Sequence, residues 1–444
     1  MNVANVLWGI GGMAVVLAIA FAFSTNRRAI KPRTVIGALL AQVVFAVVVL
    51  YWEPGKAALA ALSQGFQTLI DASGEGIDFL FGAVLPENGT VFAFQVLPVV
   101  IFVSSLTAVL YHLHILQWVV RIIGGGLQWL LGTSKAESMN ATANIFLGMT
   151  EAPLVIRPYL SRLTRSELFS VMAGGLATVA GSVLVGYALL GAKMEYLIAA
   201  AFMGAPAGLL MAKIMVPETE EATAVEKAAV KTDAGTDYAG DSGSAEADAA
   251  DGANGAAPAE AAEDAAAEEE DDRPHNVIDA AARGASEGLK LALNIGAMLL
   301  AFVSLVALLN MGLGALGGLF GMDDLSFQKI LGWIFSPLMF AVGVPWDEAV
   351  TAGGFLGQKL VLNEFVAFMD FAPQIPELSH KTVAVVTFAI CGFANIGSMA
   401  VLLGGMGSLA PNQRKAIAGL GLRAILAGTL ANLLSAAIAG ILIG

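Results

Sequence analysis

Charge, cysteine and histidine are scarce in this sequence. Only 13% of its 444 residues are charged, whereas 57% are hydrophobic, and the mean hydropathy is +0.75. Soluble domains of this length do not have such a composition, so we expect the chain to lie in a membrane. The single cysteine, Cys391, excludes an intramolecular disulfide, and with only four histidines a zinc site is not expected.

Long apolar runs make up most of the chain. A stretch of about 20 apolar residues can cross a bilayer as a helix. Such stretches occur at 5–24, 34–52, 91–111, 168–192, 195–216, 289–313, 381–406 and 416–443. Two less regular apolar stretches remain, at 115–155 and 328–370. We therefore predict an all-α polytopic protein of the cytoplasmic membrane, with about eight transmembrane helices in contact with the lipid bilayer.

Positive charges predict the orientation of these helices. A secretory signal has its charges before the apolar run, and Met1–Val6 has none, so the first run is not expected to be a signal peptide. Basic residues instead follow the first run and lie near the starts of the predicted fourth and last spans: Arg27, Arg28, Lys31 and Arg33; Arg157, Arg162 and Arg165; Arg414, Lys415 and Arg423. All are cytoplasmic if eight spans begin from an N-terminus outside the cell.

One acidic segment accounts for the net charge of −13. Residues 218–272 contain 18 acidic side chains and two lysines, with almost no large apolar residues. Such a segment cannot bury enough surface to offset the entropy lost on ordering, so we predict a disordered cytoplasmic loop. A spacer is the simpler interpretation, and a regulatory tail is the alternative. The loop divides the membrane part into two halves.

Two glutamates lie in the apolar halves, one in each. Glu151 follows Thr150, and Glu364 follows Asn363. A carboxylate at bilayer depth costs roughly 2.5–3.5 kcal/mol on insertion scales, so it is usually retained for a substrate, an ion or a paired group. This pairing is the strongest functional signal in the sequence.

The surroundings of the two glutamates repeat. A segment (114–131 or 327–344) precedes each glutamate, and a helix rich in small residues follows it, with Gly181 30 residues after Glu151 and Asn395 31 residues after Glu364. Weak repeats with glycine-interrupted helices are typical of secondary transporters, whose site lies at the repeat interface. We predict one re-entrant hairpin and one broken helix in each half, with the two repeats inverted. The alternative is that the glycines only allow close helix packing.

The polar side chains predicted within the membrane are suited to a neutral ligand. They are Asn144, Thr150, Glu151, Thr178, Ser182, Asn363, Glu364, Asn395 and Ser398. An anionic substrate would call for fixed arginines, and this set has none. Carboxylates accept hydroxyl protons and amides both donate and accept, which suits a polyhydroxylated molecule. Lys359 either pairs with a carboxylate or extends to the membrane interface.

Oxygen atoms near a helix break also suit a hard cation. Asn144, Thr178 and the backbone carbonyls around Leu147 and Val179 could hold Na⁺. The alternative for Thr178 is a hydrogen bond to its own helix, which is common for threonine in transmembrane helices.

Four motifs in order resemble the concentrative nucleoside transporter family. They are Met-Thr-Glu-Ala-Pro-Leu at 149–154, Ala-Gly-Ser-Val at 180–183, Gly-x-Lys-x-x-x-Asn-Glu-Phe at 357–365 and Gly-Phe-Ala-Asn-Ile-x-Ser at 392–398. The resemblance covers 90–216 and 276–440. The acidic loop is not part of the family pattern.

The resemblance implies a homotrimer in which a transport domain moves against a scaffold domain like an elevator. We expect N-terminal scaffold helices at 1–112, a first repeat at 113–216, the acidic loop at 217–275, a scaffold span at 276–326 and a second repeat at 327–444. The resemblance also implies nucleobase contacts from Met149, Thr150, Glu151, Val183 and Phe393, ribose contacts from Glu364, Asn395 and Ser398, and a sodium site at Asn144, Leu147, Thr178 and Val179.

One position departs from the family pattern and bears on specificity. Met149 stands where the family has a glutamine that would hydrogen-bond the base, so the preferred nucleoside is left open. The predicted function is nucleoside import by Na⁺ symport, with nucleic acid not expected as a partner. Proton symport is the close alternative. A channel and an intramembrane hydrolase are the rivals from other classes, and the chain lacks the metal motif of such an enzyme.

Overall fold

The computed structural model describes residues 3–86, 91–219, 274–322 and 324–443. Within these ranges the chain is helical and no strand is present. The predicted disorder of the acidic segment falls almost entirely on 220–273, outside the described residues.

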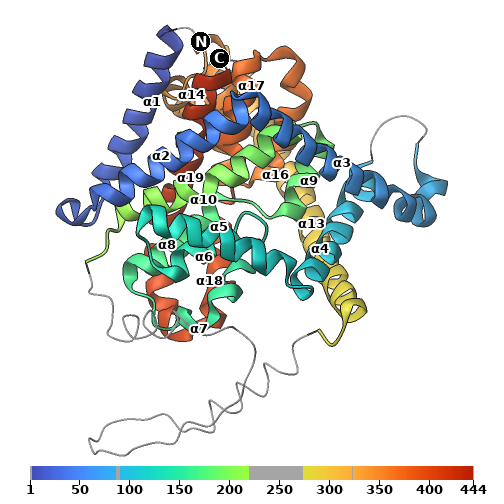
Figure 1. Cartoon of the computed structure of the whole chain (residues 1–444). Coiled ribbons are helices and arrows are strands. Elements are labelled where there is room, and N and C mark those ends of the chain that lie inside the picture. Colours follow the sequence, from blue (N-terminus) through green and yellow to red (C-terminus); the bar gives the residue numbers. More distant parts are fainter. Residues whose placement is uncertain (1–2, 87–90, 220–273, 323, 444) are drawn as a thin grey trace, which may run out of the picture.

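Figure 1 shows the helices gathered around a central bundle, with the two ends of the chain close together. The helices are α1 (Val3–Ala22), α2 (Pro32–Leu50), α3 (Glu53–Phe81), α4 (Leu97–His112), α5 (Ile115–Leu131), α6 (Lys135–Ala143), α7 (Arg157–Leu160), α8 (Arg165–Ala177), α9 (Gly181–Leu190), α10 (Met194–Met215), α13 (Val277–Gly318), α14 (Phe327–Ala341), α15 (Trp346–Val361), α16 (Glu364–Phe371), α17 (His380–Ile390), α18 (Ser398–Leu409) and α19 (Arg414–Ile443).

Seven of the eight predicted spans correspond to elements among the described residues that are long and apolar enough to cross a membrane. Helices α14 and α15, bent by 117° relative to each other, lie in the less regular stretch predicted at 328–370. The predicted crossing at 381–406 is instead divided between α17 and α18. The predicted span at 289–313 belongs to α13, which is longer, at 42 residues.

The crossing helices fall into a buried and a peripheral group. In the most apolar stretches of α8–α9, α10 and α19, 94%, 94% and 83% of the residues are buried. In α1, α2, α4 and α13 the share is only 22–28%. An apolar helix with so much exposed surface needs lipid or another protein surface against it. The first group therefore forms the core, and the second surrounds it.

The peripheral helices pack in two separate ways. Helices α1 and α2 lie on α10 and α19, where the Gln42 Nε2 donates to the Ser435 Oγ at 2.7 Å. Helix α4 packs instead along α13, where Gly284 and Gly288 let the two backbones approach closely. The Ser105 hydroxyl adds a 2.8 Å hydrogen bond to the carbonyl of Ala281. This pair of helices borders the core and forms a unit of its own.

Two of the three segments with basic clusters meet at one end of the bundle. The Asn412 side chain donates to the Ser161 carbonyl at 2.8 Å, and Gln413 donates to that of Leu163 at 3.0 Å. These bonds join the start of α19 to the loop before α8. Figure 1 shows α7 and α18 at the end opposite the chain termini. The second and third basic segments thus share a side, as predicted. Which side faces the cytoplasm stays a prediction.

Helix α3 has no counterpart among the predicted spans. It runs for 29 residues and begins with Pro54 in its first turn, a position that suits proline. Its length would suffice to cross a bilayer, but its apolar side chains are interspersed with Gln64, Gln67, Asp71 and Glu75. Figure 1 shows α3 passing across one end of the bundle.

Candidate functional site

Hairpin 1, formed by α6, the turn after it and α7, carries the first glutamate. Two capping boxes bracket this segment: Ser134 with Glu137 begins α6, and Thr164 with Glu167 begins α8. In each box the hydroxyl accepts from a backbone N–H and the glutamate accepts in return, which fixes the helix start. The hairpin therefore enters and leaves the core at well-defined points.

The residues in the turn of hairpin 1 differ in their exposure. Glu151 is exposed, and its carboxylate accepts a hydrogen bond from the Gly148 N–H at 3.2 Å. Thr150 is half-buried and its methyl group faces Gly405 of α18. Met149 is buried, with its backbone against Gly175 of α8. The chain then enters a short 3-10 helix, which Pro153 suits.

Hairpin 2, formed by α15 and α16, carries the second glutamate in a different setting. The Asn363 side chain caps α16 by accepting from the Val366 N–H at 2.9 Å. Glu364 is therefore the first residue of a regular helix, where the positive end of the helix dipole favours a carboxylate. Glu364 is only 5% exposed.

Both predicted broken helices are confirmed. Residues 178–180 separate α8 from α9, and residues 391–397 separate α17 from α18. Each break is tied to the hairpin of its own repeat: the Gly181 N–H donates to the Phe146 carbonyl and the Ile396 N–H donates to the Leu360 carbonyl, both at 3.1 Å. The two bonds join corresponding elements of the repeats, although their positions differ by one or two residues when the repeats are aligned on Glu151 and Glu364.

The two breaks also contact each other. The Phe393 N–H in the second break donates to the Thr178 carbonyl in the first at 3.2 Å. Backbone groups left free by unwinding are tolerated at this depth only inside protein or along a cavity. The breaks satisfy part of this requirement mutually, which places residues from both repeats in one small region.

A polar cluster joins hairpin 2 to the second break. The Asn395 Nδ2 donates to the Glu364 Oε2 at 3.2 Å, and the Asn395 Oδ1 accepts from the Ser398 N–H at 2.9 Å. The Ser398 hydroxyl donates to the Phe393 carbonyl. Glu364, Asn395 and Ser398 are all buried. The structure thus brings together the three residues predicted to hold the ribose.

An aromatic group lies beside this cluster. The Tyr187 ring stacks on Phe368, with centroids 4.3 Å apart, and meets the edge of Phe365 at 4.8 Å. The Tyr187 hydroxyl lies near Glu364 but has no hydrogen-bond partner of normal length among the described residues. Val183, one turn earlier on α9, is buried. Sequence reasoning missed Tyr187, although its position one turn after Val183 on the same helix was a usable signal.

The predicted cation ligands lie at the junction of hairpin 1 and the first break. Asn144 ends α6, and its amide lies against Gly174 and Gly175 of α8. The buried Asn144 Oδ1 finds no hydrogen-bond partner in the part of the chain that the structure describes. An orphaned buried oxygen is costly unless something else occupies its lone pairs, and a cation does so. Leu147 and Val179 are buried in the same region.

Thr178 fits both interpretations offered for it. Its hydroxyl donates to the Gly174 carbonyl at 3.0 Å, as threonines in transmembrane helices commonly do. Donation leaves the hydroxyl oxygen lone pairs available to a metal ion. The donor set of amide, hydroxyl and carbonyl oxygens therefore fits Na⁺.

Two further buried residues connect the repeats. Lys359 of α15 is fully buried, and its ammonium donates to the Asn432 Oδ1 at 3.3 Å. The prediction that Lys359 might extend to the membrane interface was wrong, because a hydrogen-bond acceptor is available inside. That Lys359 also pairs with the Glu364 carboxylate stays a prediction. Asn432 was missed, although an amide within the apolar run of α19 stands out in the sequence.

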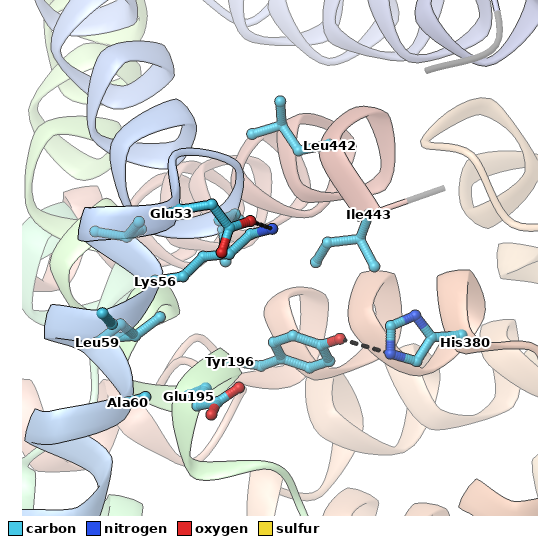
Figure 2. A pocket seen from close by; sticks show the side chains of 12 residues that line it. Glu53, Lys56, Leu59, Ala60, Glu195, Tyr196, His380, Leu442 and Ile443 are labelled. Atoms are coloured by element: carbon cyan, nitrogen blue, oxygen red, sulfur yellow. Dashed lines mark hydrogen bonds and ion pairs between the residues drawn. The ribbon is translucent and has the colours of Figure 1, made fainter.

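A separate pocket opens at the end of the bundle where the termini lie. Figure 2 shows Tyr196 and His380, joined by a 3.0 Å hydrogen bond, facing Glu53 and Lys56 across this space. Its volume is about 570 Å³. The predicted site residues are absent from its lining in the described chain, so the pocket is distinct from the polar cluster.

The predicted residues thus form two linked groups. Glu364, Phe393, Asn395 and Ser398 belong to one, and Phe393 is bonded to Thr178 near the predicted cation ligands. Thr150 and Glu151 belong to the turn of hairpin 1, which contacts α18 at Gly405. That both groups contact one ligand stays a prediction.

Comparison with known proteins agrees with this architecture. Residues 11–84 and 196–440 match the families described as Na⁺ dependent nucleoside transporter N-terminus and C-terminus, and residues 93–194 match a family described as nucleoside recognition. The chain is 53% identical to an uncharacterized transporter, YutK, of Bacillus subtilis, covering 99% of this chain and all of that protein.

Two further relatives are similarly close. The nucleoside permease NupC of Helicobacter pylori is 45% identical, with 99% of this chain and 98% of that protein covered. The structure of CNTnw in an inward-facing substrate-bound state superposes with a TM-score of 0.86 at 48% identity, covering 99% of this chain and 98% of the other. The chain therefore belongs to the concentrative nucleoside transporters, a family of membrane transporters and not of enzymes.

Proposed function

We propose that this protein imports nucleosides across the cytoplasmic membrane by symport with Na⁺. The observation that carries the proposal is the buried cluster of Glu364, Asn395 and Ser398 beside a helix break. A carboxylate, an amide and a hydroxyl in an apolar interior suit a neutral sugar with adjacent hydroxyl groups.

The ribose would be held by the second repeat. One Glu364 oxygen accepts from Asn395, which leaves the carboxylate with further acceptor positions for two sugar hydroxyls. Hydrogen bonds to a charged acceptor in a dry site are stronger than those between neutral groups. Because the cluster is already hydrogen-bonded, little ordering would be needed on binding.

The nucleobase would lie toward hairpin 1, near Thr150, Glu151, Val183 and Phe393. Glu151 could accept a base N–H, and the Thr150 hydroxyl could donate or accept. Met149 adds no hydrogen bond, and its buried side chain leaves base recognition to its neighbours. The separate pocket of Figure 2 lies apart from these residues and has no role in this proposal.

Sodium would supply the driving force. Asn144, Thr178 and the carbonyls of Leu147 and Val179 are the proposed ligands. One cation contributes about 2.3 kcal/mol per 100 mV of membrane potential, which permits roughly fifty-fold accumulation of a neutral solute because about 1.36 kcal/mol is tenfold. Symport requires that ion and nucleoside each favour the state that binds the other. The Thr178–Phe393 bond offers a short connection between the two sites.

We further propose that the core moves against a scaffold as in an elevator, within a homotrimer. Helices α1 and α2 pack on α10 and α19, whereas α4 and α13 pair with each other. This packing favours a smaller scaffold than residues 1–112, one centred on α4 and α13. The largely exposed apolar surface of α13 supports a subunit interface there.

Uptake by purified protein in liposomes tests the coupling ion. We expect accumulation of labelled uridine or adenosine with an inward sodium gradient and only equilibration without one. Uptake that follows a pH gradient and ignores sodium would favour proton symport, with Glu151 or Glu364 as the proton carrier. Equal uptake with neither gradient would contradict the proposal of symport.

A further inference from the structure

A fully buried lysine, Lys359, lies in hairpin 2 of the second repeat. Lys359 is fully buried within the membrane core. Removing an ammonium from water is expensive, so an unpaired lysine at this depth would not be expected to stay charged. Lys359 has a partner: its Nζ lies 3.3 Å from the Asn432 Oδ1. Glu364 follows five residues later in the same hairpin.

Asn432 places this ammonium next to the ends of two helices. Its Nδ2 donates to the Ala177 carbonyl, the last residue of α8, at 2.8 Å, and to the Cys391 carbonyl just after α17 at 3.0 Å. Helix C-termini carry partial negative charge, and both of these lie in a low-dielectric interior. Gly392 is required beside Asn432, because a Cβ there would collide with the amide.

The internal repeat places Lys359 opposite the proposed sodium site. Aligning the repeats on Glu151 and Glu364 pairs Thr178 with Cys391 and Phe146 with Lys359. In the first repeat, hairpin 1 places the orphaned oxygen of Asn144 beside the end of α8, just before the helix break. At the matching junction of the second repeat, the hairpin contributes a positive charge of its own.

We propose that Lys359 is a tethered cation, which performs in the second repeat the role that sodium performs in the first. This inference rests on the proposed sodium symport. The ammonium would neutralise the C-terminal end of α17 and the Glu364 carboxylate, as sodium would neutralise the C-terminal end of α8. A covalently attached charge is always present, so the second junction needs no ion from solution.

Variants at Lys359 test this role through binding of uridine to detergent-purified protein, measured by calorimetry over a series of sodium concentrations. Lys359→Met keeps the length of the side chain and removes the charge, and we expect uridine affinity to fall at least tenfold. Lys359→Ser leaves space and an oxygen ligand. We expect sodium to enter there, so that the slope of log affinity against log sodium concentration rises from about one toward two.

Controls separate a specific role from a general loss of packing. Lys213→Met removes another buried ammonium, which pairs with Glu137 at 2.6 Å away from the breaks, and should leave the sodium slope unchanged. Size-exclusion profiles and melting temperatures establish that each variant is folded. Wild-type affinity in Lys359→Met, or the same sodium slope in Lys359→Ser as in Lys359→Met, would overturn the proposal.

A measurement on the unmodified protein covers the case in which the variants do not fold. The ratio of sodium to uridine moved into liposomes should be one, because a single junction takes its cation from solution; a ratio of two would overturn the proposal. Sodium-independent binding in the wild type would instead contradict sodium symport. The need for the Lys359 charge would then still be decided by uridine affinity in Lys359→Met.

Discussion

The two glutamates that identify the site lie in unlike surroundings. Glu364 is 5% exposed, begins a capped helix and is bonded to Asn395, which is itself bonded to Ser398. Glu151 is exposed, lies between a turn and a 3-10 helix, and has one bond to the Gly148 N–H. The glutamate of the second repeat thus belongs to a buried, hydrogen-bonded cluster, whereas the glutamate of the first repeat lies in an exposed turn with one hydrogen bond.

This difference suggests how the proposed site can be selective for the sugar and still accept different bases. All ribonucleosides have the same sugar, so a rigid cluster at Glu364 would suit all of them. The bases differ in shape and in the positions of their donors, so an exposed acceptor with a single hydrogen bond, such as Glu151, would suit several. A rigid site discriminates strongly against a missing hydroxyl because its own polar groups are then left unpaired.

The largest effect is expected from a substitution of Glu364. Glu364→Gln should abolish uridine uptake, because the amide loses the charge and half of the acceptor capacity needed for two sugar hydroxyls. Uptake into liposomes and stabilisation of the protein by uridine in a thermal-shift assay measure this. Glu195→Gln, which removes a carboxylate at the separate pocket of Figure 2, is the control.

The fold of Glu364→Gln should survive, since a glutamine can still accept from Asn395. Equal stabilisation of the variant and the wild type by uridine would contradict a ribose contact. Deoxygenated nucleosides refine the same comparison: loss of either ribose hydroxyl should weaken binding to the wild type far more than a change of base does.

The next effect concerns the cation. Asn144→Leu replaces the orphaned amide by a side chain of similar size, and we expect at least a tenfold higher sodium concentration for half-maximal uptake. Maximal uptake at saturating sodium should fall less than in Glu364→Gln. The sodium dependence of uptake rates provides the measurement. Unchanged sodium dependence would remove Asn144 from the ion site.

Much of this architecture could be predicted because the membrane restricts the chain so strongly. Twenty apolar residues must form a helix, and the breaks at Gly181 and at 391–397 are recognisable from small and polar residues that an unbroken span would not need. The repeat followed from the spacing of Glu151 and Glu364. The Asn395–Glu364 bond then agrees with the predicted ribose cluster.

Other features depend on contacts that no local pattern records. Helix α3 mixes polar with apolar residues, so a search for continuous apolar runs passes over it. The amide of Asn432 is visible in the apolar run of α19, but its partners, Lys359, Ala177 and Cys391, come from three distant segments and could not be predicted. The same reason explains why the surroundings of Lys359 were left undecided between two interpretations: the sequence indicates that a buried charge needs a partner, but not which one.

In the turn of hairpin 1, Glu151→Gln should weaken uptake by less than Glu364→Gln and change the order of preferred bases. The amide keeps an acceptor and adds a donor, so a base that presents an acceptor there gains what another base loses. Competition of unlabelled nucleosides with labelled uridine gives the ranking. An equal loss for every nucleoside would place Glu151 in a role other than base recognition.

The smallest effect is expected from a substitution of Met149. Met149→Gln restores the family residue, but the side chain is buried against α8 at Gly175, so a glutamine must turn toward the ligand to be useful. We expect a shift of a fewfold in the ranking of uridine against adenosine, with total uptake nearly unchanged. Met149→Leu keeps the side chain apolar and should preserve the wild-type ranking. If Met149→Gln also leaves the ranking unchanged, Met149 does not contact the base. Thr150 and Glu151 in the turn of hairpin 1 would then account for base recognition without it.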